Sequence, residues 1–379
     1  MTYLRGIACL LIAAALAAAS APQFLRMRRP DTVVAGPGVT AERRLSEWLP
    51  RIAGTPVDTP VFVLDGAAPG GTVVVLGGTH GDEVAGYLAA VVLVERARVR
   101  GGRLLVLPRA NASGFTHDVG QEAHPQEITL ATSGGVRRFT VGARATNPVH
   151  QWPDPQVYVH AASGQALSGS ETRNLNRAYP GREDGTLTEQ LAFAITSMLK
   201  RERADLAIDL HEASPEYPVV NTMVAHQRAM DLAALANIAL QERGIAIGLE
   251  ASPEGLHGLS HREWGDATRA YAVLAETTNP AQGRLRGRTD AALVTSGRDR
   301  FYTQLAARGR LSVSFPAEGW PLDVRVGRHL ETVRELVTTL STLSPDRAVQ
   351  IDDEPSASEV MASGLGQFLR PPTAARTQP

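Results

Sequence analysis

The 379-residue sequence predicts an α/β fold with a mixed, mostly parallel central sheet and helices on both of its faces. Two observations indicate this fold class. Short apolar runs alternate along the chain with longer segments of helical periodicity, a pattern typical of layered α/β proteins. Several of these runs are continuously apolar, as expected of strands that are buried on both faces.

The elements follow from the positions of these runs. Strands are predicted at 60–66, 72–78, 103–108, 205–211, 221–225, 245–250, 272–278 and 311–316. Helices are predicted at 83–98, 186–202, 227–243, 300–308 and 327–342. The stretch 115–172 interrupts the rhythm, because it is polar and rich in Gly, Pro and His. Its segment EITLATSGGVRRFTVGAR predicts a β-hairpin. Long insertions are often functional, so we expect 115–172 to form a lid or a pocket wall.

The two ends of the chain differ from its body. Arg5 precedes an apolar run of about 16 residues that ends in small residues, as in export signals. Residues 1–29 are therefore predicted to be a signal peptide or an uncleaved membrane anchor, and either places the body outside the cytoplasm. Residues 352–379 are rich in Ser, Pro and Ala and predict a flexible tail. Between them, 40–345 is expected to be one domain that contains the insertion.

Composition narrows the possible functions. A formal net charge of −1 gives no reason to expect a nucleic-acid partner, and membrane contact is expected only through the N-terminal segment. The one cysteine, Cys9, lies in the apolar run, so the body has no disulfide, cysteine nucleophile or cysteine metal ligand. The sequence also lacks the G-x-S-x-G, Walker and dinucleotide-binding motifs.

Metal-binding residue types follow two of the predicted strands. In TVVVLGGTHGDEVAG, His80 and Glu83 come directly after an apolar strand, where a helix begins. In ADLAIDLHEAS, His211 ends a second strand, and Asp209 shares its face of that strand. Ligands of open α/β sheets bind beyond the carboxyl ends of the strands. Two imidazoles and one carboxylate suit Zn²⁺ in hydrolases, and Asp209 could orient His211.

Two further segments carry groups suited to hydrolysis. Asn176 and Arg177, in ETRNLNRAYPG, offer directional donors for a substrate carboxylate or carbonyl oxygen. Glu276 ends the apolar strand YAVLAETT, where a carboxylate is costly to bury unless it faces a polar cavity. Beside a metal-activated water it could accept a proton and return it to a leaving amine. Residues 255–265 either border the substrate or form a surface loop.

In this order along the chain, five segments resemble the succinylglutamate desuccinylase/aspartoacylase family of the zinc carboxypeptidase clan. They are GGTHGDE, LPRANASG, NLNRAYPG, DLHEAS and AETTNP, within roughly residues 70–345. The resemblance implies a zinc carboxypeptidase-like fold and one Zn²⁺ ion held by His80, Glu83 and His211. It implies that Asn176 and Arg177 contact the substrate. Glu276 would be the general base and acid.

Some positions depart from the family pattern. Asn174 stands where the family often has Asp as the partner of the first histidine, and its carbonyl oxygen could still accept. For the further substrate-binding arginine of peptidase relatives, Arg144 and Arg173 are the candidates. No tyrosine precedes Glu276 at the spacing of peptidases. We therefore expect a deacylase that cleaves an amide in a small N-acyl amino acid carrying a carboxylate. The alternatives are a metallocarboxypeptidase acting on exported peptides or cell-wall fragments, and a binding protein without activity.

Overall fold

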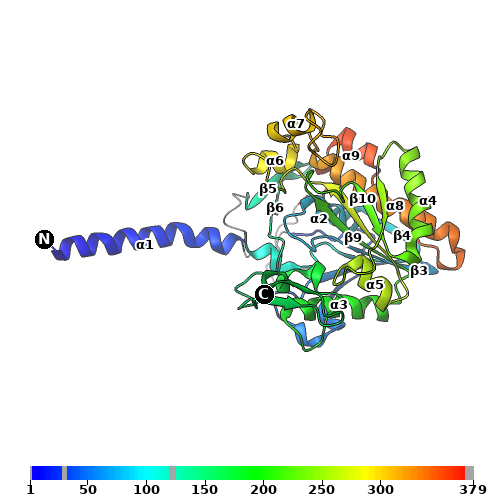
Figure 1. The fold of residues 1–379 in the computed structure, drawn as a ribbon, viewed down its shortest axis with the longest axis horizontal. Helices are drawn as coiled ribbons and strands as arrows, with labels where there is room; N and C mark the ends of the chain where they lie inside the picture. The colour runs from blue at the N-terminus through cyan, green and yellow to red at the C-terminus, as the bar shows by residue number, and fades with distance from the viewer. Residues whose placement is uncertain (1, 28–31, 119–124, 372–379) are drawn as a thin grey trace.

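The computed structural model describes residues 2–27, 32–118 and 125–371. One large mixed sheet runs through the body of the molecule, and helices cover both of its faces (Figure 1). The predicted fold class is therefore confirmed.

The large sheet contains β1 (Ala41–Arg44), β2 (Pro60–Asp65), β3 (Ala68–Leu76), β4 (Arg98–Leu107), β9 (Leu206–Ala213), β10 (Thr222–Ala225), β11 (Gly248–Ala251), β12 (Tyr271–Thr278) and β13 (Gln350–Asp352). Two small sheets are formed by β5 (Glu127–Thr132) with β6 (Gly135–Thr140) and by β7 (Val157–Val159) with β8 (Ala166–Ser168). The α-helices are α1 (Thr2–Met27), α2 (Val84–Arg96), α3 (Leu187–Arg201), α4 (Met230–Glu242), α5 (Ser260–Ala267), α6 (Ala291–Ser296), α7 (Arg300–Ala306), α8 (Leu322–Leu343) and α9 (Ala357–Ser363).

The strand order is β1-β2-β4-β3-β9-β12-β10-β11, with β13 paired to β4. The four central strands β4, β3, β9 and β12 are parallel to one another, whereas β2 and β10 run antiparallel to their inner neighbours. Because the central strands are parallel, their carboxyl ends meet at one edge of the sheet, where a ligand crevice is expected.

Each face of the sheet has its own hydrophobic core. Helices α2, α4 and α8 cover one face, onto which β9 directs Ile208. Helices α3 and α5 cover the other face, onto which β9 directs Ala207 and, at the same parity, Asp209 and His211. The candidate ligand of β9 therefore lies on the α3/α5 face, near the carboxyl end of the strand.

A close contact brings α2 against β9. Gly86 lies in the first turn of α2, and a Cβ there would lie 2.4 Å from the carbonyl oxygen of Leu210. Only glycine permits this approach without a shift of the backbone. Because Glu83 is the N-cap residue of α2 and His211 follows Leu210, this contact brings two candidate ligands together.

Helix α1 extends away from the rest of the molecule (Figure 1). Its segment Tyr3–Pro22 is long and apolar enough to cross a membrane, with a mean hydropathy of 2.0 and no burial against the body. A membrane-crossing helix needs about 20 apolar residues, so the helix has the dimensions of either a signal sequence or an anchor.

The insertion contains the predicted hairpin, β5–β6, and a second short pair, β7–β8. The hairpin packs on α2: Arg137 pairs with the buried Glu95 at 2.8 Å, and the Phe139 ring lies 6.4 Å from that of Tyr87. The hairpin is thus part of the hydrophobic core beside α2.

Two sequence predictions differ from the structure. Residues 311–316 form no strand; of this run Phe315 is buried, and its ring packs 5.4 Å from that of Tyr302. An alternating apolar pattern can thus be satisfied by one loop contact without a partner strand.

The predicted flexible tail over 352–379 also requires correction. Residues 352–371 pack on the body, with Val360, Leu365 and Leu369 buried and the Arg370 backbone N–H donating to Glu95 at 2.6 Å. The apolar residues were spaced too widely among Ser and Pro to predict this packing. Residues 372–379 lie outside the described part of the chain.

Candidate active site

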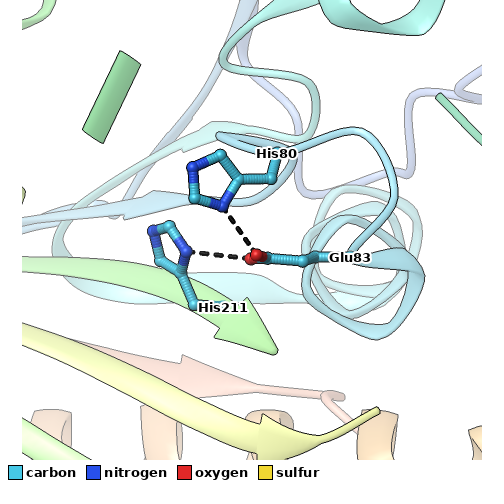
Figure 2. Close-up of side chains that lie close together, drawn as sticks. All are labelled: His80, Glu83 and His211. Atoms are coloured by element: carbon cyan, nitrogen blue, oxygen red, sulfur yellow. Dashed lines mark hydrogen bonds and ion pairs between the residues drawn. The ribbon is translucent and has the colours of Figure 1, made fainter. Parts of the chain in front are cut away.

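His80, Glu83 and His211 come together in the structure. His80 lies in the turn after β3, Glu83 at the start of α2, and His211 in β9 (Figure 2). All three side chains are buried, and their possible ligand atoms lie within 4.8 Å of one another. A cluster of this size can surround one ion.

Glu83 lies between the two imidazoles. Its Oε1 is 2.6 Å from Nδ1 of His80, and its Oε2 is 2.8 Å from Nδ1 of His211 (Figure 2). Burial favours the neutral carboxyl, but the two imidazoles hold the pKa of Glu83 well below its usual range. The carboxylate is therefore ionised, as a metal ligand must be.

The outer nitrogen of each imidazole lies beside an oxygen atom, in a hydrogen bond for His80 and in an ion pair for His211. Nε2 of His80 lies 3.0 Å from Oδ1 of Asn174, and Nε2 of His211 lies 2.9 Å from Oδ2 of Asp209. The hydroxyl of Thr79 donates to the other oxygen of Asp209 at 2.8 Å. Acceptors of this kind fix the tautomer and the ring orientation of metal-binding histidines.

These contacts fit a divalent cation. Burial, together with nearby Arg144, lowers the pKa of His80 to about 4, so its imidazole is neutral. When Nε2 donates to Asn174, Nδ1 carries a lone pair that faces Glu83 at 2.6 Å. In this tautomer a lone pair and a carboxylate oxygen face one another, and these are donor atoms that a divalent cation needs. Nη1 of Arg144 lies 3.3 Å from that nitrogen.

Asn174 provides a test of this arrangement. Its Oδ1 accepts from His80 and from the backbone N–H of Asn176, and its Nδ2 donates to Glu171 at 2.7 Å. Asn174→Ala should weaken zinc binding about 10–100-fold, because the imidazole loses its orienting acceptor. Asn174→Asp, combined with Glu171→Gln so that two carboxylates do not face each other, keeps that acceptor and should stay within a few-fold of wild type. Competition titration against a chromophoric chelator measures both; equal affinities for the Ala and Asp variants would contradict the role given to Asn174.

Glu276 lies in the same cavity as the cluster. It is the register partner of His211 on the neighbouring strand β12, so both side chains share one face of the sheet. Burial raises the pKa of Glu276 to about 8, although His211 acts in the opposite direction. Oε2 of Glu276 forms no hydrogen bond with the described residues. The carboxyl therefore has an affinity for protons near neutrality and one buried oxygen without a hydrogen-bond partner among the described residues.

Asn176 and Arg177 line this cavity from the segment before α3. The backbone N–H of Ser260 donates to Oδ1 of Asn176 at 2.8 Å, which leaves the amide nitrogen as a donor toward the cavity. Arg177 donates to the carbonyl oxygen of Asn176 at 2.7 Å and lies 3.7 Å from Glu171. This partial pairing leaves part of the guanidinium for a substrate anion.

The two arginines considered in the sequence have different surroundings. Arg144 lines the cavity and contacts His80 and Glu83. Arg173 instead forms two hydrogen bonds with Asp154, at 2.7 and 2.8 Å, and is not among the residues that line the cavity. Of the described residues in 115–172, Arg144 alone lines the cavity, so the other described residues of this insertion do not form its wall.

For one part of the cavity wall the sequence left two alternatives, a substrate border or a surface loop. Residues 255–265 include α5, from which His261 lines the cavity beside Leu256 and Leu259. His261 is buried, its Nδ1 lies 2.8 Å from the hydroxyl of Ser252, and burial lowers its pKa to about 3. One sequence signal could have indicated this helix: polar residues with helical spacing surround Trp264, which is buried.

Residues 158–276 match the family model described as the succinylglutamate desuccinylase/aspartoacylase catalytic domain. The match lies within residues 70–345, the part of the chain over which the sequence resembles this family. The resemblance predicted from the sequence is thereby confirmed. The matched stretch contains Asn176, Arg177, His211 and Glu276, whereas His80 and Glu83 precede it.

Individual proteins match this chain at low sequence identity. A stretch of 159 residues is 25% identical to the N-alpha-acetyl-L-2,4-diaminobutyric acid deacetylase of Halomonas elongata, and covers 41% of this chain and 33% of that protein. A succinylglutamate desuccinylase structure from Silicibacter sp. is 22% identical with a TM-score of 0.39, over 60% of this chain and 55% of that one. The product-bound cell shape determinant protein Csd4 from Helicobacter pylori is 14% identical with a TM-score of 0.45, over 81% of this chain and 59% of that one. The chain thus spans about a third of the curated relative that it matches.

Proposed function

We propose that this protein is a zinc-dependent hydrolase that cleaves an amide bond in a small N-acyl amino acid. The observation that carries the proposal is the cluster of His80, Glu83 and His211 in one cavity with the unpaired carboxyl oxygen of Glu276. Two histidines and one glutamate form a common ligand set of zinc hydrolases. The family match and the cleavage of an N-acetyl compound named for the Halomonas relative support the same reaction class.

The residues of this chain have separable roles in such a reaction. A zinc ion held by the three ligands would polarise the scissile carbonyl and acidify a water molecule. Glu276 accepts the proton of that water as its oxygen bonds to the carbonyl carbon. Glu276 then delivers the proton to the amide nitrogen as the C–N bond breaks, which yields a carboxylic acid and an amine; the acid proton passes to the amine, so the products leave as a carboxylate and an ammonium ion. Arg177 and the amide nitrogen of Asn176 hold a substrate carboxylate or the developing oxyanion.

The cavity suggests a substrate of limited size. Its volume is about 370 Å³, within the range of small-molecule sites, and two arginines, Arg144 and Arg177, line it. A planar guanidinium pairs well with a carboxylate. A free amino acid carboxylate on the substrate is therefore part of the proposal.

A second candidate is a metallocarboxypeptidase that acts on exported peptides or cell-wall fragments. It is favoured by one observation: the hairpin β5–β6 packs on α2, and of the described part of the insertion Arg144 alone lines the cavity. Part of a longer bound substrate could therefore extend out of the cavity. Comparison of N-acyl amino acids with short peptides as substrates for the zinc-loaded protein separates the two candidates.

We also propose that the enzyme acts outside the cytoplasm. The support is the 20-residue apolar segment of α1, which is 0% buried against the body. The segment would serve either as a cleaved signal or as an anchor. Fractionation of cells, with the N-terminal residue of the mature protein determined, distinguishes these two outcomes.

Metal removal tests the hydrolase proposal directly. Protein treated with a chelator should lose its amidase activity, and one equivalent of Zn²⁺ should restore it, because the structure offers one cluster of three ligands among the described residues. Metal analysis and a discontinuous amidase assay measure this. A chelated protein that still cleaves its substrate at the original rate would contradict the proposed mechanism.

A further inference from the structure

Beyond Glu276, the cavity continues along the same face of the sheet. Leu274 is two residues before Glu276 on β12 and therefore points to the same face. Val224 of β10 is the register partner of Leu274. Both line the cavity, so its floor changes from carboxylate to aliphatic within one pleat of the strand.

Other apolar side chains complete this part of the cavity. Leu256 and Leu259 come from the segment between β11 and α5, and Val219 comes from the connection between β9 and β10. Leu256 is 37% exposed, whereas Leu259 is buried. We call Val219, Val224, Leu256, Leu259 and Leu274 the apolar subsite. Aliphatic surface that lines an open cavity is typical of a place where a ligand buries an apolar group.

The charges at the two ends of the cavity have opposite sign. Arg144 lies on the side of His80 and Glu83, as its contacts with both residues show. At the other end Glu250, the register partner of Val224 on β11, lines the cavity with an exposed side chain. A carboxylate at that end disfavours a second substrate anion beyond the apolar subsite.

We propose that the apolar subsite selects substrates with an uncharged aliphatic or aromatic group next to the scissile amide, and that Glu250 discriminates against dicarboxylic substrates. This inference deepens the proposed function and rests on it. The ligand is an N-acyl amino acid with one carboxylate, held near Arg177, and one apolar group. That group is either the acyl chain or the amino acid side chain.

Two substrate series distinguish these sources, each measured with the zinc-loaded full-length protein. The first extends the acyl group of one amino acid from acetyl through butanoyl and pentanoyl to hexanoyl. The second keeps N-acetyl and enlarges the side chain from alanine to leucine and phenylalanine. In the series that enters the subsite, kcat/KM should rise about fourfold per methylene, equivalent to about 0.8 kcal/mol. If neither series shows a rise, the inference is overturned.

A charged substrate tests the role of Glu250. N-succinyl and N-pentanoyl groups are similar in length, but the succinyl group ends in a carboxylate. If the acyl chain enters the subsite, the succinyl compound should be cleaved at least about tenfold less efficiently, since it forfeits about two methylene increments. Glu250→Gln should narrow that difference. If the side chain enters, the same comparison is made with N-acetylglutamate and N-acetylnorvaline. An unchanged ratio in Glu250→Gln would contradict the role of Glu250.

A variant links the preference to the subsite itself. Leu256→Asp changes a partly exposed side chain and should remove the rise of kcat/KM with chain length, while the zinc content stays as in wild type. Leu235→Asp is the matched control, because Leu235 is 47% exposed on α4 and is not among the residues that line the cavity. A Leu256→Asp protein that keeps the full preference would overturn the assignment of the subsite.

Failure of this inference is distinguishable from failure of the proposed function. A wild-type protein that binds one zinc ion and cleaves N-acetyl substrates, but without any dependence on apolar size, loses the subsite and keeps the hydrolase. A wild-type protein that binds no zinc and cleaves none of the compounds loses both.

Discussion

Glu276→Gln should lower kcat about 10²–10⁴-fold while the zinc content stays at the wild-type level. Glutamine has the size of glutamate but cannot accept the proton of the attacking water. Glu276 is outside the cluster of the three ligands, so its replacement should leave metal binding intact. Single-turnover kinetics on a confirmed substrate, together with metal analysis of the same sample, measure the two quantities separately.

Two comparisons make this result specific. His211→Ala should lose both zinc and turnover, because it removes a ligand from the cluster. Glu242→Gln changes an exposed carboxylate at the end of α4 and should leave both unchanged. A Glu276→Gln protein with the wild-type rate would show that another group is the base.

The parts of the site that follow strand ends could be predicted from the sequence. His80 with Glu83 and His211 each come at the end of an apolar run, and parallel strands bring such ends together. Glu276 was predicted for the same reason, and the register of β12 with β9 places it beside His211. The ends of the apolar runs therefore predicted that these four residues lie at the same edge of the sheet.

The cavity wall could not be predicted in this way. Leu256, Leu259 and His261 come from a loop and a short helix, and their contact with the cavity depends on how that segment packs on Arg177. Gly258 makes this packing possible: its φ of +83° is accessible to glycine, and a Cβ there would lie 2.2 Å from the carbonyl oxygen of Arg177. A contact between residues so distant in the chain leaves no local pattern.

A buried ion pair lies behind the cluster of His80, Glu83 and His211. Glu212 follows His211 on β9 and pairs with Arg325 of α8 at 2.5 Å, with both side chains 0% exposed. The other oxygen of Glu212 accepts from the backbone N–H of Ala85 at 2.9 Å, in the first turn of the helix that begins at Glu83. Glu212 therefore caps α2 from another strand while the side chain of Glu83 faces the two histidines.

Arg325→Met should destabilise the fold by about 3–5 kcal/mol, the usual cost when one partner of a buried pair is removed. Burial already raises the pKa of Glu212, and Arg325 opposes this, so the variant leaves an uncompensated buried carboxylate. Arg325 also donates to the carbonyl oxygens of Val294 and Trp320, which lose their donor. Urea unfolding of the metal-free protein measures the change without a contribution from zinc binding.

A double variant separates the cost of the unpaired carboxylate from the cost of the hydrogen bonds that Arg325 loses. Glu212→Gln combined with Arg325→Met removes both charges, and its amide oxygen can still accept from Ala85. If the cost of Arg325→Met arises from the unpaired carboxylate, the double variant should be more stable than Arg325→Met alone, since replacing both partners of a buried pair is often close to neutral. Equal stabilities would instead assign the cost to the bonds from Arg325 to Val294 and Trp320. Because Glu212 caps the helix that begins at Glu83, the recovered stability should be accompanied by recovered zinc affinity.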